Sequence, residues 1–189
     1  MNEKAQRSPK ECTLQLRITL RNTDPIIWRR VLVPGTMPLD QLHRVIQVVM
    51  GWEDRHLHVF EIRGKRYGVL DLEGEDEDLD ETGLRLRLIM DERDRFTYEY
   101  DLGDGWLHDV EVETTEVTET EMLDPVCLDG ARTCPPEDCG GAWRFAEFLK
   151  IMADPTHNEH ETMTTWLGGV FDPEHFSVGA ANARIQRLR

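Results

Sequence analysis

The chain has 189 residues, a length typical of one domain that can bury a sizeable core. It carries 37 acidic and 22 basic residues, and the formal net charge of −15 argues against general binding to nucleic-acid phosphates or anionic lipids. No apolar run is long enough to cross a bilayer, and residues 1–11 lack the pattern of a secretory signal, so we expect a cytoplasmic protein with reduced cysteines.

The first part of the chain predicts two strands and one helix. Apolar and polar residues alternate over 14–20, which predicts a strand with one buried face. Turn residues at 22–25 connect it to a second strand over 26–33, so the two strands form a hairpin. From Pro38 the apolar spacing becomes helical, and Gly51 is placed to end the helix.

The middle of the chain predicts further strands around an acidic segment. One strand runs from about 56 to 62 and turns at 64–65 into a short partner. Residues 71–81 are nearly all acidic, and their mutual repulsion predicts a mobile loop. Alternating apolar residues over 84–90 favour a strand, with a short helix as the alternative.

The hairpin over 96–113 is the best-specified element, but two registers fit its turn residues 103–105. A two-residue loop would place His108 opposite Asp101. A three-residue loop would instead pair Tyr100 with His108. We favour the second register because it gathers the apolar and aromatic side chains on one face of the hairpin.

The last part of the chain predicts helices. Residues 127–141 are rich in proline, glycine and cysteine, so we expect them to be irregular. Apolar spacing over 143–152 marks one helix, and Asp154-Pro155 and Asp172-Pro173 each resemble the start of another. The order of strands first and helices last predicts an α+β fold: an antiparallel sheet built from hairpins, with one early helix and a C-terminal group of helices.

Several motifs occur in succession along the chain. They are Ile27-Trp28-Arg29-Arg30, Leu42-His43, Gly51-Trp52, His56-Leu57-His58-Val59-Phe60, Tyr98-Glu99-Tyr100-Asp101, Gly103-Asp104-Gly105-Trp106-Leu107-His108, and the segments 125–130 and 134–141. Together they resemble the plasmid pRiA4b ORF-3-like family over nearly the whole chain.

The resemblance implies an α+β fold, but no established activity, cofactor or catalytic residue. Some similar proteins are described as passengers of insertion elements, which implies an accessory role associated with mobile elements. We expect a flexible segment over 1–11, followed by a single domain of this family over 12–189.

His56 and His58 are the first candidate metal ligands. If both lie on one strand, their spacing of two places them on the same face. Asp101, Asp104 or His108 could then complete a metal site. The alternative is that they are histidines at the edge of the core, bonded to the backbone or to carboxylates.

The segment 134–141 is the second candidate. Together with Cys127, its residues Cys134 and Cys139 could hold zinc or form a redox-sensitive pair. Their spacing matches no standard structural zinc site. We therefore favour a rigid loop whose cysteines pack as small apolar groups.

Two functional hypotheses remain. The chain has no phosphate-binding glycine loop, nucleophile elbow or HExxH motif, so we favour a non-enzymatic binding or accessory protein. We expect a protein partner rather than nucleic acid, and no membrane. The candidate surface comprises Tyr100, Asp101, Asp104, Trp106, His108, Glu137 and Asp138. The alternative is a metal-dependent hydrolase in which His56, His58, Asp101, Asp104 and His108 converge.

Overall fold

The computed structural model of the chain describes residues 11–69, 78–90, 93–118, 122 and 124–188. Residues 1–10 of the expected flexible segment and residues 71–77 of the expected acidic loop lie outside the described residues, whereas Glu11 begins a strand and residues 79–80 form another. None of the helices in the described ranges is long and apolar enough to cross a membrane.

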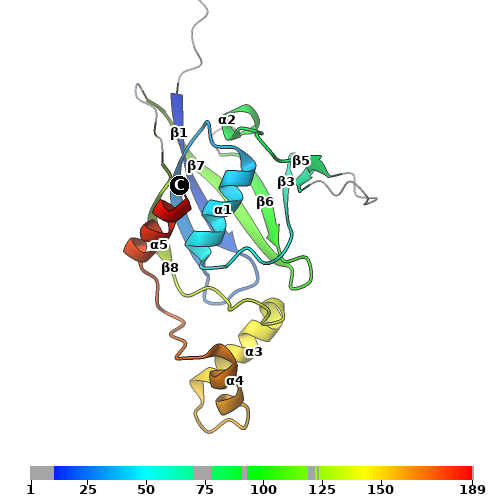
Figure 1. Cartoon of the computed structure of the whole chain (residues 1–189), viewed down its shortest axis with the longest axis vertical. Helices are drawn as coiled ribbons and strands as arrows, with labels where there is room; N and C mark the ends of the chain where they lie inside the picture. Colours follow the sequence, from blue (N-terminus) through cyan, green and yellow to red (C-terminus); the bar gives the residue numbers. More distant parts are fainter. Residues whose placement is uncertain (1–10, 70–77, 91–92, 119–121, 123, 189) are drawn as a thin grey trace, which may run out of the picture.

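An eight-stranded sheet forms the body of the protein (Figure 1). Its strand order is β5-β4-β3-β6-β7-β1-β2-β8. The strands are β1 (Glu11–Leu20), β2 (Trp28–Pro34), β3 (His58–Ile62), β4 (Lys65–Gly68), β5 (Leu79–Asp80), β6 (Arg95–Tyr100), β7 (Trp106–Thr118) and β8 (Val126–Ala131). Every neighbouring pair is antiparallel except β4 and β5, so the predicted antiparallel sheet is confirmed.

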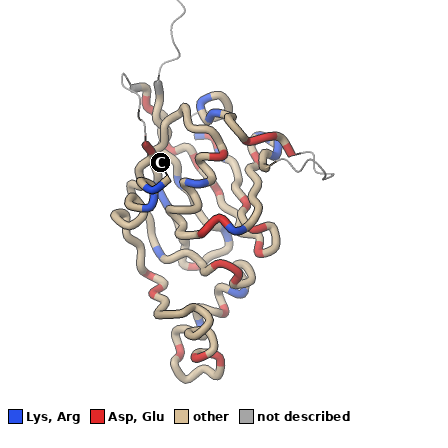
Figure 2. The backbone as a smooth tube through the Cα atoms, viewed as in Figure 1, with Lys and Arg blue, Asp and Glu red and all other residues tan. Residues whose placement is uncertain are grey.

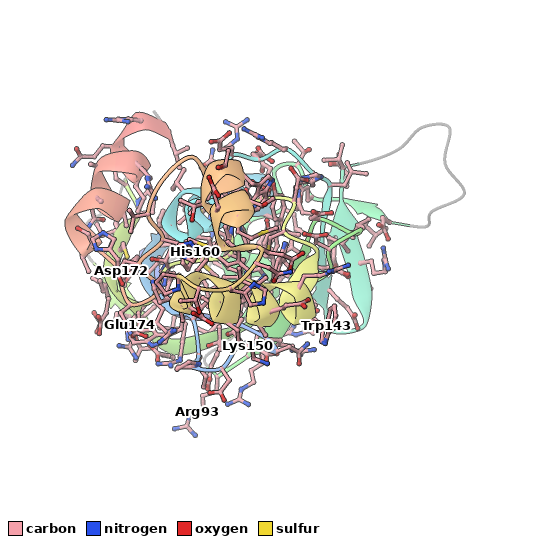
Figure 3. All side chains as sticks on the ribbon, turned by 90° about the horizontal axis from the view of Figure 1, so that it is seen from below. Arg93, Trp143, Lys150, His160, Asp172 and Glu174 are labelled. Carbon is pink, nitrogen blue, oxygen red and sulfur yellow. The ribbon has the colours of Figure 1, made fainter. Side chains whose placement is uncertain are left out.

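Five α-helices accompany the sheet in the described residues. They are α1 (Leu39–Met50), α2 (Leu86–Ile89), α3 (Gly141–Ala153), α4 (His160–Leu167) and α5 (Val178–Ile185), and α5 continues into a 3-10 turn, Gln186–Leu188. In Figure 1, α1 crosses the sheet and α5 lies beside it next to β8, while α3 and α4 project together at one end. Figure 3 views this end and labels Trp143 and Lys150 on α3.

The early hairpin and helix form where the sequence predicts them. β1 pairs with β2, and the apolar residues of β1, such as Leu16 and Ile18, are fully buried. In α1 the residues at helical spacing, Leu42 and Ile46 among them, are buried as well. Gly51 ends the helix with a φ of 102°, a left-handed conformation that glycine adopts without strain.

Two predicted elements differ from the structure. Residues 86–89 form the short helix α2, so the favoured strand is wrong there and the alternative is confirmed. The segment 127–131, expected to be irregular, forms most of strand β8. Hydrogen bonding to the edge of β2 outweighs the weak strand propensity of its Asp and Gly residues, since tertiary pairing overrides local preference in sheets.

Both proline-containing start signals near the C-terminus lie ahead of their helices. Asp154-Pro155 and Asp172-Pro173 form turns, because each aspartate side chain accepts a hydrogen bond from the backbone two residues on, Thr156 at 2.9 Å and Glu174 at 3.0 Å. The helices begin later, at His160 and Val178.

The register of the β6–β7 hairpin also differs from the prediction. Tyr100 lies opposite Trp106, and His108 lies opposite Tyr98, so the expected pairing of Tyr100 with His108 is wrong. The difference is two residues, and side chains alternate with a period of two. The predicted apolar face is therefore correct, and the turn is longer, covering 101–105.

Asp101 explains the longer turn. Its φ of 55° takes the chain out of the strand conformation. Its Oδ1 accepts hydrogen bonds from the backbone amides of Gly103 and Asp104, at 3.0 and 3.2 Å, and its carbonyl accepts one from Gly105 at 2.6 Å. These bonds stabilise a five-residue turn, which the sequence pattern of the strands alone does not reveal.

Candidate functional site

Three loops meet at the turn of the β6–β7 hairpin. One precedes β3 and carries His56, the second is the turn itself with Asp101, and the third is the segment 134–141, which leads into α3. Figure 2 shows acidic residues along these loops. Residues that carry the family resemblance in three separate parts of the sequence thus gather at one end of the sheet, next to α3 (Figure 1).

Two glycines allow the third loop to approach the hairpin turn. The amide of Gly140 donates a hydrogen bond to Asp104 Oδ2 at 2.9 Å. A Cβ atom on Gly141 would lie 2.6 Å from the backbone oxygen of Asp104, a clash that no side chain tolerates. Gly141 also has a φ of 79°, so both the space and the backbone conformation require glycine.

His56 directs its Nε2 atom toward three carboxylates. The atom lies 3.0 Å from Asp138 Oδ1, 3.6 Å from Asp101 Oδ2 and 3.8 Å from Glu137 Oε2. It is shielded from solvent, yet it forms no hydrogen bond with any of them. The 3.0 Å approach of His56 Nε2 to Asp138 Oδ1 is therefore a close contact whose alignment is too poor for a hydrogen bond.

His56, Asp101 and Asp138 form a cluster with the spacing of metal ligands. Each offers one ligand atom, and the three atoms lie within 4.8 Å of one another. Among the described residues, this is the one group of three or more His, Cys, Asp or Glu side chains with that property. We call these three residues the His–Asp cluster.

One carboxylate oxygen of Asp101 is fixed by the hairpin turn. Its Oδ1 is occupied by the turn amides, which leaves Oδ2 to face His56. The side chain is 10% exposed. Such a buried carboxylate with one oxygen fixed by the backbone has little freedom to turn away from its neighbour.

Glu137 borders the cluster and is fixed by two donors. The Tyr100 hydroxyl donates to its carboxylate at 3.1 and 3.2 Å, and the amide of Glu53 donates at 2.9 Å. Burial is the main cause that raises the pKa of Tyr100, so its hydroxyl stays protonated and able to donate.

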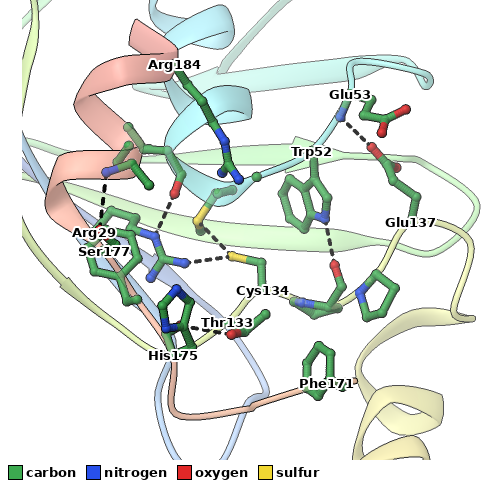
Figure 4. A pocket seen from close by; sticks show the side chains of 18 of the residues that line it. Arg29, Trp52, Glu53, Thr133, Cys134, Glu137, Phe171, His175, Ser177 and Arg184 are labelled. Carbon is green, nitrogen blue, oxygen red and sulfur yellow. Dashed lines mark hydrogen bonds between the residues drawn. The ribbon is translucent and has the colours of Figure 1, made fainter. Parts of the chain in front are cut away.

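A cavity of about 400 Å³ lies beside the third loop (Figure 4). Trp52 and Cys134 are part of its wall, and the Trp52 indole donates a hydrogen bond to the Pro135 carbonyl at 2.9 Å. Glu137 also lines the cavity, so the cavity and the His–Asp cluster adjoin each other through this residue.

His58 does not join the His–Asp cluster. His56 lies in the loop before β3, so the alternation that would place both histidines on one face does not extend to it. The buried His58 bonds to Glu81 at 2.9 Å and stacks on His43 with ring centroids 3.5 Å apart. Burial, followed by the neighbouring His58, lowers the pKa of His43.

Three further candidates of the hairpin also lie apart from the cluster. Asp104 accepts its hydrogen bond from the third loop, and Trp106 is 1% exposed in the core. His108 is fully buried, and its Nδ1 lies 3.1 Å from the Tyr98 carbonyl, to which it donates. Burial lowers the pKa of His108 to about 4.

The buried neutral His108 predicts an acid-sensitive fold. Its pKa in the folded state, about 4, lies below the unfolded value, so the folded state resists protonation. The contribution of neutral His108 to the free energy of unfolding is complete above about pH 6.5. It decreases by about 3 kcal/mol as the pH falls to about 4, because the unfolded chain takes up the proton first. We expect His108→Asn, which keeps a donor near the Tyr98 carbonyl, to show a smaller loss of stability between pH 7 and pH 4.5. Urea unfolding at both values measures this, and parallel losses in the two proteins would contradict it.

The cysteines do not gather into a site within the described residues. Cys127 and Cys134 are buried, Cys139 is partly buried, and all are free thiols. Burial is the main cause that raises the pKa of each, to about 12 for Cys139. Buried or partly buried neutral thiols are consistent with the favoured interpretation of a rigid loop with packed cysteines.

The fold and the cluster define an α+β protein with an antiparallel sheet and a polar site where three loops meet. The chain matches the family described as plasmid pRiA4b ORF-3-like protein over residues 12–180, and it belongs to that family. It is similar to the uncharacterised protein y4hQ of Sinorhizobium fredii, with 39% identity over 160 residues, covering 82% of this chain and 80% of the relative.

A solved structure shows the same fold. The crystal structure of MM3350 from Methanosarcina mazei Go1, a protein of unknown function, superposes with a TM-score of 0.82 at 34% identity. The match covers 90% of this chain and 98% of that protein. These relatives establish the family and the fold, and their names give no activity.

Proposed function

We propose that this protein binds one divalent transition-metal cation at the His–Asp cluster. The observation that carries the proposal is His56 Nε2, which is shielded from solvent and faces carboxylates without forming a hydrogen bond. Ligand atoms about 2.1 Å from a tetrahedral cation lie about 3.4 Å apart. The distances from Nε2 to Asp138 and Asp101, 3.0 and 3.6 Å, lie on either side of that value.

The charges around His56 support a cation. Asp101, Glu137 and Asp138 bring three carboxylates within 3.8 Å of one imidazole nitrogen. Carboxylates that share a site repel one another, and a divalent cation offsets that repulsion. One imidazole with two carboxylates is a ligand set suited to Zn²⁺ or Mn²⁺.

The role that we propose for the cation is to organise a binding surface. Its ligands would come from three loops, so binding would fix segment 134–141 against the hairpin turn. The net charge of −15 favours a protein partner with a basic face over nucleic acid. The family description refers to a plasmid reading frame, which supports an accessory role associated with mobile elements.

A metal-dependent hydrolase is the second candidate function, and one observation favours it. Three protein ligands leave a coordination position for water, and the cluster adjoins a cavity through Glu137. Turnover of p-nitrophenyl phosphate or p-nitrophenyl acetate by the zinc- or manganese-loaded protein would support this candidate. Cation binding without turnover of either would support the binding role.

Calorimetric titration of the chelator-treated protein with ZnCl₂ and MnCl₂ tests cation binding. We expect one equivalent of at least one metal to bind per chain. The histidine ring signals in NMR locate the site: those of His56 should shift or broaden, whereas those of the exposed His175 should not. No binding, or binding that perturbs other histidines and leaves His56 unchanged, would overturn the proposal.

A further inference from the structure

The cavity beside the third loop has the dimensions of a small-molecule site. It lies between the end of α1, the segment 133–137, the segment 171–177 and α5 (Figure 4). Its volume of about 400 Å³ falls within the range of about 300–1,000 Å³ found for ligand pockets. It is therefore large enough for a compact organic molecule.

The charge of the cavity lining is opposite to that of the whole protein. Three arginines, Arg29, Arg55 and Arg184, line it, together with only two acidic residues, Glu53 and Glu137. Arg55 pairs with Glu53, and Glu137 lies at the side of the His–Asp cluster. On the side of the cavity away from Glu53 and Glu137, the charged lining residues are therefore Arg29 and Arg184, although the net charge of the whole chain is −15.

Arg29 is a buried cation without an acidic partner in the described residues. It is 1% exposed, and its Nε donates to the Val49 carbonyl at 2.7 Å. Its two terminal nitrogens donate to three further carbonyls, of Trp28, Ala131 and Arg132, and to the Cys134 sulfur. Burial raises the pKa of the Cys134 thiol, so the thiol stays neutral and does not offset the charge.

Arg29 places a positive charge in the wall of the cavity. The donors of Arg29 are all occupied, so it cannot hold a ligand by hydrogen bonds of its own. Its charge nevertheless acts through a low-dielectric interior, where electrostatic interactions are stronger than in water. An anion in the cavity would lie in that field.

Arg184 is placed to contact an anion directly. It is an exposed residue of α5, and Figure 4 shows its side chain extending toward the cavity from the side opposite Thr133. Its Nη1 lies 3.2 Å from the position that a Cβ on Gly51 would take, at the end of α1. Within the described part of the chain, Arg184 forms no ion pair or side-chain hydrogen bond.

Aromatic side chains supply the apolar part of the lining. Phe176 stacks on Arg29, with the guanidinium carbon 4.0 Å from the ring centroid. Trp52 and Phe171 also belong to the wall. Flat apolar surfaces beside cations suit a ligand that combines an anionic group with a ring or chain.

We propose that this cavity binds a small organic anion, whose carboxylate or phosphate pairs with Arg184 and whose apolar part packs against Trp52 and Phe176. The inference is separate from the proposed cation site, because none of its contacts involves His56, Asp101 or Asp138.

Calorimetric titration in the presence of EDTA tests the cavity without any contribution from a metal. The probes are phenyl phosphate and benzoate, with neutral benzyl alcohol and cationic benzylamine as controls of similar shape. We expect at least one of the two anions to bind tenfold or more tightly than either control. The stronger of the two anions identifies the preferred head group.

Matched arginine substitutions locate the binding. Arg184→Gln should weaken the preferred anion at least tenfold, whereas Arg187→Gln, the same change three residues further along the exposed surface, should leave it unaltered. Equal binding of anion and alcohol, no binding of either anion, or equal effects of the two substitutions would overturn the inference. A failure to bind zinc or manganese would leave all of these outcomes unchanged.

Discussion

Replacing Arg29 with methionine should lower the free energy of unfolding by about 3–5 kcal/mol, because the removed guanidinium leaves buried acceptors unpaired. Four carbonyl oxygens, from Val49, Trp28, Ala131 and Arg132, receive hydrogen bonds from this one side chain. Methionine replaces the aliphatic part of the side chain, but it leaves the space of the guanidinium group empty and donates to none of these oxygens. Arg29 thus joins β2 to the end of α1 and to the chain after β8.

The neighbouring Arg30 supplies the matched control. It points to the other face of β2, where it forms a bidentate pair with Glu113 at 2.6 and 2.8 Å and is 26% exposed. Solvent screens this pair, so Arg30→Met should cost about 1 kcal/mol. Urea unfolding at pH 7 measures both variants, and similar losses for the two would contradict the role assigned to Arg29.

Asp101→Asn should weaken zinc or manganese binding by about 1,000-fold, because loss of a direct ligand exceeds the 10- to 100-fold cost of losing an outer partner. Asparagine tolerates the positive φ of this position, and its amide oxygen can still accept the turn hydrogen bonds to Gly103 and Asp104. The change therefore preserves the turn and replaces the oxygen that faces His56 with a nitrogen that cannot bind a cation.

Asp104→Asn is the control within the same turn. Asp104 bonds to the amide of Gly140 and lies outside the His–Asp cluster, so its substitution should change cation affinity less than about tenfold. Competition against a chromophoric chelator measures both variants. If Asp101→Asn binds metal as tightly as the unsubstituted protein, Asp101 is not a ligand.

The regular part of the fold follows from the sequence because its signals are local. The alternation over 14–20 and the helical spacing before Gly51 predict β1 and α1 from neighbouring residues alone. The β6–β7 register differs by two residues because the side chain of Asp101 hydrogen-bonds within the turn. That interaction depends on a backbone conformation that hydrophobic alternation does not reveal.

The site is predicted in part. The sequence analysis identifies His56, Asp101 and Asp138 as candidates. It groups His56 with His58, however, because the predicted strand begins two residues before β3 does. The three loops meet because of the order of the strands in the sheet and because Gly141 lies close to Asp104, and both depend on residues far apart in the sequence. No spacing along the chain encodes that contact.

Arg29 is the residue whose role the sequence reading misses. In the sequence it is only one residue of the Ile27-Trp28-Arg29-Arg30 motif, whereas in the structure it lies in the core and lines the cavity. The alternation along β2 already indicated this position, because Arg29 lies on the same face of the strand as Val31 and Val33, which are buried. A charged residue on the inward face of a strand predicts a buried polar role.

We propose that His56, Asp101 and Asp138 hold a cation. Elemental mass spectrometry of the tag-free protein, purified without chelator, tests it most directly, with Asp101→Asn and Asp104→Asn prepared in parallel. We predict close to one zinc or manganese per chain in the unsubstituted protein and in Asp104→Asn, and a large loss in Asp101→Asn. Absence of metal from the unsubstituted protein, or equal metal in all three, would contradict the claim and reduce the cluster to a structural contact between charged groups.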